Sequence, residues 1–319
     1  MTSVRYRRNE YDVTNRVNTT DPVAVASEVC RVYQDLYQRD HPGNIPQSFD
    51  DLTRLYRGEY PGYYACDTSY HDIQHVLDVT LAMARLMDGC VRAIDSGAVD
   101  ERLFRFGIIS ALYHDCGYIR HRKDTRHSNG AEYTKTHVSR GGKFLEEYLA
   151  RIGMGDLAHA ASGTLHFTGY EIPIDRIRVD PQFRLMGNLL GSADMLAQMA
   201  DRCYLEKCYD RLYPEFVYGG LARELRADGT EEVIFGSAAD LIYKTPEFYS
   251  SAQRRLKVDL AGYGDYAEKH FGGENLYWSE LEKNIEHARN ISQCEDLSML
   301  RRRPPETLVQ EPAEPELLI

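Results

Sequence analysis

The sequence has few cysteines, and they lack the CxxC spacing of paired thiols. Their number is odd, and they occur at positions 30, 66, 90, 116, 203, 208 and 294. This pattern indicates reduced thiols and predicts a cytoplasmic protein. The opening residues MTSVRYRRNEYD contain no apolar segment of the kind found in signal peptides, and no apolar run is long enough to span a bilayer.

Positive charge is also scarce. Lys and Arg total 38 against 49 Asp and Glu, which gives a formal net charge of -11. Broad attraction to nucleic acid or to an anionic membrane is therefore not expected. A local basic pocket for a small phosphorylated molecule is compatible with this charge. Hydrophobic residues make up 43% of the chain and charged residues 27%, as is typical of a soluble globular protein.

The sequence has no clear run of alternating polar and apolar residues, the pattern expected of strands. Apolar residues recur at helical spacing instead, which predicts an all-α fold. The expected helices cover about 71–94, 100–118, 134–152, 154–167 and 181–213, with a polar loop at 119–133 and further helical segments in 236–260 and 275–291. We expect a flexible segment at 1–20, a helical domain over 21–300 with its core in about 55–215, and a disordered, proline-rich tail at 301–319.

Two acidic residues interrupt apolar helical sequence. Asp115 ends the run FGIISALYHD, and Asp194 lies in LMGNLLGSADMLAQMA beside small residues. An ionised carboxylate in such surroundings is unfavourable unless a cation or strong hydrogen bonds compensate it. His75 lies on another apolar helical face, and His114 directly precedes Asp115. A shared buried metal would explain this combination, although a hydrogen-bonded core histidine is the alternative for His75 taken alone.

Further histidines occur where helices are expected to begin or end. His137 begins the amphipathic run HVSRGGKFLEEYLARIG, and His166 ends DLAHAASGTLH. His159 lies seven residues before His166 on the same helical face. We prefer His166 as a metal ligand because a helix end leaves more open space, and we expect His159 to be a core or surface residue.

These residues resemble the HD superfamily of metal-dependent phosphohydrolases. The superfamily pattern H…HD…D corresponds here to His75, His114 with Asp115, and Asp194. His137 and His166 correspond to the additional ligands of members that bind two metals. The resemblance covers about residues 55–215 and implies an all-α HD-domain bundle with additional C-terminal helices.

The stretch YHDIQHVLDV is also similar to the signature of cyclic nucleotide phosphodiesterases, with Asp72 in place of Asn. In that group the first histidine donates a proton and the second binds metal, which implies these roles for His71 and His75. The spacing places them one helical turn, about 5 Å, apart along a helix axis. At Tyr118 the sequence departs from the phosphodiesterases, which have His there, and from cyclic-di-GMP-type HD proteins, which have Lys.

The resemblance implies a pair of divalent ions (Fe, Mn, Zn, Ni or Mg) bridged by Asp115. Metal-activated hydroxide would cleave a small phosphoester or nucleotide, with His71 as general acid. Two alternatives stay open: a di-iron oxygenase with the same ligand set, and a nucleotide-sensing module without turnover. Cations of the 119–133 loop, together with Arg202, Lys207 and Arg211, are candidates for contacting substrate phosphate.

Overall fold

The computed structural model describes residues 6–94, 97–226 and 228–306. The expected all-α fold is confirmed. The helices are α1 (Pro22–Tyr37), α2 (Ile45–Tyr56), α3 (Ile73–Ala93), α4 (Glu101–Tyr113), α5 (His137–Arg151), α6 (Ala158–Leu165), α7 (Pro181–Ala200), α8 (Tyr204–Lys207), α9 (Tyr213–Tyr218), α10 (Ala238–Arg254), α11 (Ala267–Phe271) and α12 (Leu276–Cys294). Short 3-10 turns include η1 (Cys116–Tyr118) and η2 (Gly130–Tyr133), and π-helical turns continue α8 (η5, Cys208–Leu212) and α10 (η6, Arg255–Asp259).

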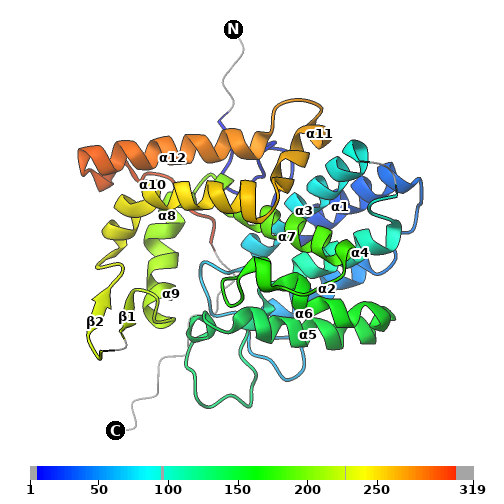
Figure 1. The fold of residues 1–319 in the computed structure, drawn as a ribbon, viewed down its shortest axis with the longest axis horizontal. Helices are drawn as coiled ribbons and strands as arrows, with labels where there is room; N and C mark the ends of the chain where they lie inside the picture. The colour runs from blue at the N-terminus through cyan, green and yellow to red at the C-terminus, as the bar shows by residue number, and fades with distance from the viewer. Residues whose placement is uncertain (1–5, 95–96, 227, 307–319) are drawn as a thin grey trace.

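Helix α3 lies at the centre of the molecule and is buried along most of its length. It packs against α1, α4, α7 and α11, while α5 and α6 lie side by side (Figure 1) and α5 also packs against η1. Helices α10 and α12 pack against each other, and α12 also packs against α7. Buried apolar side chains from Val17 to Ile291 form one contiguous core. The segments that carry the candidate ligands therefore meet within a single packed body.

Two expected helices are shorter than the sequence indicated. The helix expected at 181–213 ends at Ala200, where the Asp201 carboxylate accepts a hydrogen bond from Cys203 N at 2.6 Å and pairs with Lys207 at 2.5 Å. The chain then continues as α8, η5 and α9. The helix expected at 100–118 ends at Tyr113 and is followed by the turn η1.

The segment that precedes α1 is packed in the structure, so the expectation of a flexible stretch over 1–20 is wrong for residues 6–20. The Asp12 carboxylate forms a buried ion pair with Arg85 of α3 at 2.5 Å, and Arg7 pairs with Glu280 of α12 at 3.1 Å. At the other end, the backbone N–H of Arg302 donates to Glu206 at 3.0 Å. The rest of the tail expected to be disordered, 307–319, lies outside the described residues.

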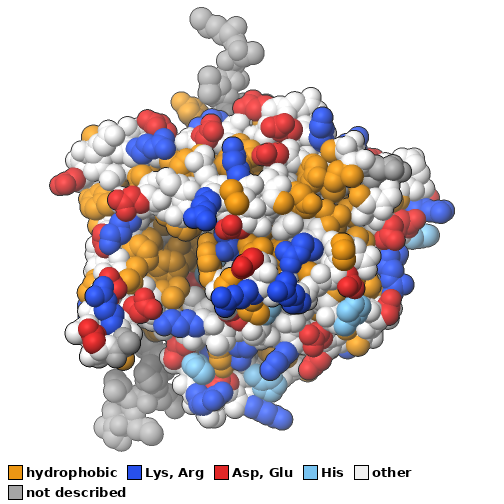
Figure 2. Space-filling view, in the orientation of Figure 1, with side chains coloured by type: hydrophobic (Ala, Val, Ile, Leu, Met, Phe, Trp, Pro, Cys, Tyr) orange, Lys and Arg blue, Asp and Glu red, His pale blue; other side chains and the backbone are white. Residues whose placement is uncertain are grey.

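A small antiparallel hairpin, which the sequence analysis did not anticipate, joins β1 (Arg223–Leu225) to β2 (Glu231–Val233). It is the only sheet in the described ranges. None of the helices described combines the length and apolar character needed to cross a bilayer. On the face seen in Figure 2, basic and acidic side chains are interspersed and do not form one continuous basic surface.

Candidate metal centre

Helix α3 carries His75 in its first turn. The helix begins at Ile73, and the carboxylate of the N-cap residue Asp72 accepts a hydrogen bond from His75 N at 2.9 Å. His71 therefore precedes the helix, and the expectation that His71 and His75 share it is wrong. The two rings are nevertheless close, with centroids 5.8 Å apart. The loop places His71 beside His75 without making it part of the same helical face.

His114 and Asp115 lie where α4 ends, and both are nearly inaccessible to solvent. The ring Nδ1 of His114 lies 2.7 Å from the carbonyl oxygen of Ala111. Because a carbonyl only accepts hydrogen bonds, the proton is on Nδ1, and the Nε2 lone pair is available for a cation. Neither His114 Nε2 nor Asp115 Oδ2 has a hydrogen bond among the described residues. Two buried polar atoms thus face each other unsatisfied, which is rare in folded proteins.

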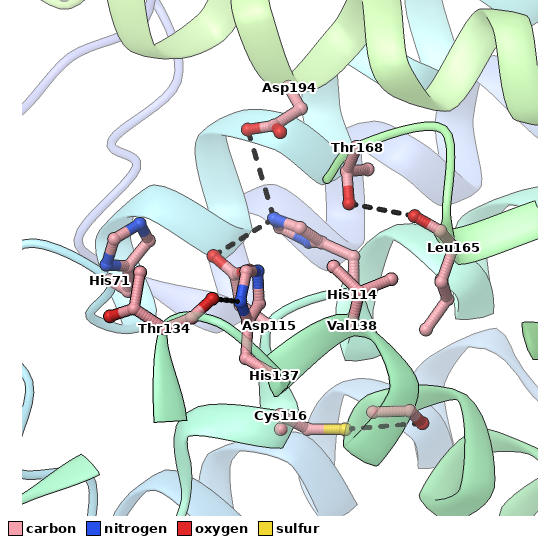
Figure 3. Close-up of polar contacts among 12 residues, drawn as sticks. His71, His114, Asp115, Cys116, Thr134, His137, Val138, Leu165, Thr168 and Asp194 are labelled. Atoms are coloured by element: carbon pink, nitrogen blue, oxygen red, sulfur yellow. Dashed lines mark hydrogen bonds and ion pairs between the residues drawn. The ribbon is translucent and has the colours of Figure 1, made fainter. Parts of the chain in front are cut away.

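Asp194 reaches the same point from α7 (Figure 3). His75 Nε2 lies 3.2 Å from Asp115 Oδ2 and 3.4 Å from Asp194 Oδ1. His114 Nε2 lies 3.2 Å from Asp115 Oδ2 and 4.0 Å from Asp194 Oδ1. One ligand atom from each of His75, His114 and Asp115 lies within 4.8 Å of the others. Two imidazole nitrogens and two carboxylate oxygens therefore converge from three segments of the chain.

His137 approaches the other oxygen of Asp115. It is the first residue of α5, and its Nε2 lies 3.7 Å from Asp115 Oδ1. The Nδ1 of His137 donates to the carbonyl oxygen of Thr134 at 2.7 Å, which again leaves the Nε2 lone pair free. Asp115 thus presents one oxygen to His75 and His114 and the other to His137, as a carboxylate that bridges two ions would.

His166 is less closely connected. It is the C-cap residue of α6 and is buried, and its Nδ1 has no hydrogen-bond partner among the described residues. Within the described ranges, His166 forms no ion pair with Asp115 or Asp194. Its role as a ligand of a second metal ion therefore stays a prediction. His159, the competing candidate, is exposed, and its Nδ1 donates to the carbonyl oxygen of Asp156 at 2.8 Å.

Protonation in the cluster follows from burial and from the two carboxylates. Burial alone would lower the pKa of His75, but the nearby carboxylates of Asp115 and Asp194 outweigh it and raise the pKa to about 10. Burial would raise the pKa of Asp115, yet the neighbouring His114 holds it well below its usual range. Burial lowers the pKa of His137 and of His166, which favours their neutral form. Protons on the histidines thus compensate the negative charge of the carboxylates. A divalent cation would take over this role, because metal binding displaces protons from its ligands.

His71 is held by a carboxylate that the sequence analysis missed. Its Nδ1 lies 2.5 Å from Oε2 of Glu215, and the other oxygen of Glu215 accepts a hydrogen bond from Tyr70 N at 2.5 Å. Glu215 lies in α9 and is almost fully buried, although it is 144 residues away in sequence. The one available signal was an acidic residue within the largely apolar run YPEFVY.

Three of the cations proposed to contact phosphate are paired with carboxylates. Arg120 pairs with Asp67 at 2.7 Å, and the Lys207 ammonium pairs with Asp201. Arg211 lies 3.5 Å from Asp72. Of the three downstream cations, only Arg211 contacts a residue next to His71.

The fold and the cluster define an all-α protein with a buried histidine–aspartate centre. The model of the Npun_R2479-like family matches residues 59–262, more than half of the chain, so the chain belongs to this family. The matched region contains all of the candidate ligands and Glu215. Comparison with curated proteins and with solved structures gave no significant match. The family name specifies no reaction, so the functional proposal rests on the geometry of the site.

Proposed function

We propose that this protein is a metal-dependent phosphohydrolase that cleaves a phosphoester or nucleotide. One observation carries the proposal: His71, held by the buried carboxylate of Glu215, lies beside the convergent group of His75, His114, Asp115 and Asp194. A cation-binding cluster next to a paired histidine provides both parts that phosphoester hydrolysis requires, namely electrophilic activation and a proton for the leaving oxygen.

His75, His114, Asp115 and Asp194 would hold one divalent ion, and His137 and His166 would contribute to a second. The unsatisfied Nε2 of His114 and Oδ2 of Asp115 support this fit, as do the Nδ1 hydrogen bonds that aim His114 and His137. Mixed imidazole and carboxylate ligands suit Fe, Mn, Zn, Ni or related ions. When bound, such ions would supply Lewis acidity toward a phosphoryl oxygen and would activate water near neutral pH.

His71 would act as the general acid. Glu215 accepts the Nδ1–H of the ring, so a proton on Nε2 is the one available to a leaving oxygen. The carboxylate also fixes the orientation of the ring by a charge-assisted hydrogen bond. The side chains of His71, His137 and Asp194 are 17%, 15% and 13% exposed, whereas that of His114 is 1% exposed. Substrate would therefore approach from the side of His71, with the metal cluster behind it.

The chemistry of the site and of the chain favours a small phosphorylated substrate in the cytoplasm. All seven cysteines are unpaired, as is typical of a reducing compartment. The mixed charge on the visible face in Figure 2 and the net charge of -11 do not favour a nucleic-acid substrate. The positioned proton donor favours hydrolysis over the nucleotide-sensing alternative, because sensing requires no proton transfer to a leaving group.

The test is turnover after reconstitution with single metals. Metal-free protein is loaded with Mn²⁺, Zn²⁺, Ni²⁺, Mg²⁺ or, under nitrogen, Fe²⁺, and is assayed on 4-nitrophenyl phosphate, bis(4-nitrophenyl) phosphate and a panel of nucleotides. Oxygen consumption is followed in parallel. We expect metal-dependent hydrolysis without oxygen uptake, retained in the control His159→Ala. Oxygen uptake by a two-iron form without hydrolysis would instead identify the di-iron oxygenase, and nucleotide binding without turnover would identify the sensing module.

A further inference from the structure

One aromatic ring contacts both the candidate proton donor and a candidate metal ligand. The ring of Tyr118 stacks on that of His71, with centroids 4.4 Å apart and planes at 19°, and on that of His137, with centroids 4.3 Å apart and planes at 18°. The rings of His71 and His137 are themselves 6.4 Å apart. Tyr118 is thus the aromatic contact that the two histidines share.

The local backbone fixes this arrangement. The turn η1 follows Asp115 directly and ends at Tyr118. The backbone N–H of Tyr118 donates to the Asp115 carbonyl at 3.1 Å. A Cβ atom at the preceding Gly117 would overlap the carbonyl group of His137, so glycine permits η1 to lie against the start of α5. Gly130 similarly allows η2 to approach the carbonyl oxygen of Tyr118. The ring is 2% exposed and is therefore held in place by its surroundings.

The ring of Tyr118 is the part of the residue that stacks on both histidines. His71 and His137 are each anchored at Nδ1, by Glu215 and by the Thr134 carbonyl. One hydrogen bond at Nδ1 allows some rotation of the imidazole about its Cβ–Cγ bond, and a stacked ring limits this rotation.

We propose that Tyr118 is a positioning residue that sets the ring planes of both His71 and His137. This inference rests on the proposed function, in which His71 donates a proton and His137 binds metal. The ring directs Nε2 of His71 toward the leaving group and Nε2 of His137 toward Asp115.

The experiment compares Tyr118→Phe, which keeps the ring, with Tyr118→Leu and Tyr118→Met, which remove it. Tyr148→Leu is the matched control, because Tyr148 is also buried but its ring contacts that of Tyr113, with planes tilted by 39°. The first readout is the NMR spectrum of metal-free protein labelled with ¹³C-histidine. Loss of the ring current should shift the Hε1 signals of His71 and His137 in the Leu and Met variants and leave that of His159 unchanged. Tyr118→Phe should preserve all three signals.

The second readout is kcat for two leaving groups. In the Leu and Met variants, kcat for an alkyl phosphoester should fall about 10-fold, the scale of one lost aromatic contact, and less for a 4-nitrophenyl ester, which needs no proton. Tyr118→Phe and Tyr148→Leu should stay near wild type. Unchanged His71 and His137 signals, or equal losses of kcat for both esters, would overturn the proposal. If the Leu and Met variants show the expected NMR shifts but the wild-type protein hydrolyses neither ester, the positioning role is supported and the proposed function is rejected. The two failures are therefore distinguishable.

Discussion

Glu215 offers a sensitive test of how His71 acts. The substitution Glu215→Gln keeps the shape of the side chain and an amide oxygen that can accept the hydrogen bond from Tyr70 N. The amide NH₂ group would then face His71 Nδ1 and donate to it, so the ring could no longer donate from Nδ1. The hydrogen bond from His71 Nδ1 to the charged carboxylate, 2.5 Å long, would be lost.

The size of the effect follows from this lost contact. A hydrogen bond to a charged group contributes about 1.5–3 kcal/mol. At about 1.36 kcal/mol per tenfold change in rate, kcat should fall roughly 10- to 150-fold. The loss should be largest for alkyl phosphoesters and much smaller for 4-nitrophenyl esters, whose leaving group departs without a proton. Metal content should not change, because Glu215 contacts none of the candidate ligands.

The assay measures kcat for both esters and bound metal by mass spectrometry in wild type, Glu215→Gln and Glu206→Gln. Glu206 is a matched control, since it is also a buried glutamate but accepts a hydrogen bond from Arg302. The reasoning would be refuted by equal losses for the two leaving groups, or by loss of metal in Glu215→Gln. Equal effects of the two glutamate substitutions would indicate a structural role only.

Three further outcomes are expected. His71→Ala should retain metal but lower kcat for alkyl esters by roughly 10²- to 10⁴-fold, and an unchanged rate would remove His71 from the mechanism. Asp12→Asn should lower the free energy of unfolding in urea by about 3–5 kcal/mol, because it leaves Arg85 buried without its partner. Burial raises the pKa of Asp12, but Arg85 lowers it overall, so this stabilisation is present above about pH 4 and is lost as the pH falls through the folded-state pKa. A difference between wild type and Asp12→Asn that did not shrink on acidification below this pH would contradict the ion pair. Gly117→Ala should cost about 1–3 kcal/mol of stability by steric overlap with the His137 carbonyl and should shift the His137 NMR signal, and wild-type stability would show that the contact is easily relieved.

Much of the fold was predictable because helical periodicity is a local property. The apolar faces of α3, α4 and α7 identified these helices, and Asp115 and Asp194 stood out as acids within them. The structure brings these two acids together with His75 and His114. Their proximity depends on how the helices pack, which periodicity alone does not determine, so the expectation that they meet came from the resemblance to the HD superfamily.

The features that sequence reasoning missed depend on contacts between distant segments. Glu215 is paired with His71 across 144 residues, and nothing in its short helix marks it as functional. The polar N-terminal segment was interpreted as flexible, yet Asp12 pairs with Arg85, 73 residues away. In both cases a charged residue is stabilised by a partner that local sequence cannot identify. The break at Asp201 is different, because its carboxylate contacts Cys203 N and Lys207, which are close to it in sequence.

The central claim is that Asp115 and its neighbours hold a divalent metal ion, and metal content tests it most directly. Wild type, Asp115→Ala and His159→Ala are reconstituted with the same metal, desalted and analysed by mass spectrometry for moles of metal per chain. We expect at least one ion per chain in wild type and in His159→Ala, and loss of most of that metal in Asp115→Ala, because the carboxylate that faces His75, His114 and His137 is gone. Full metal content in Asp115→Ala would contradict the assignment of this cluster as a metal centre.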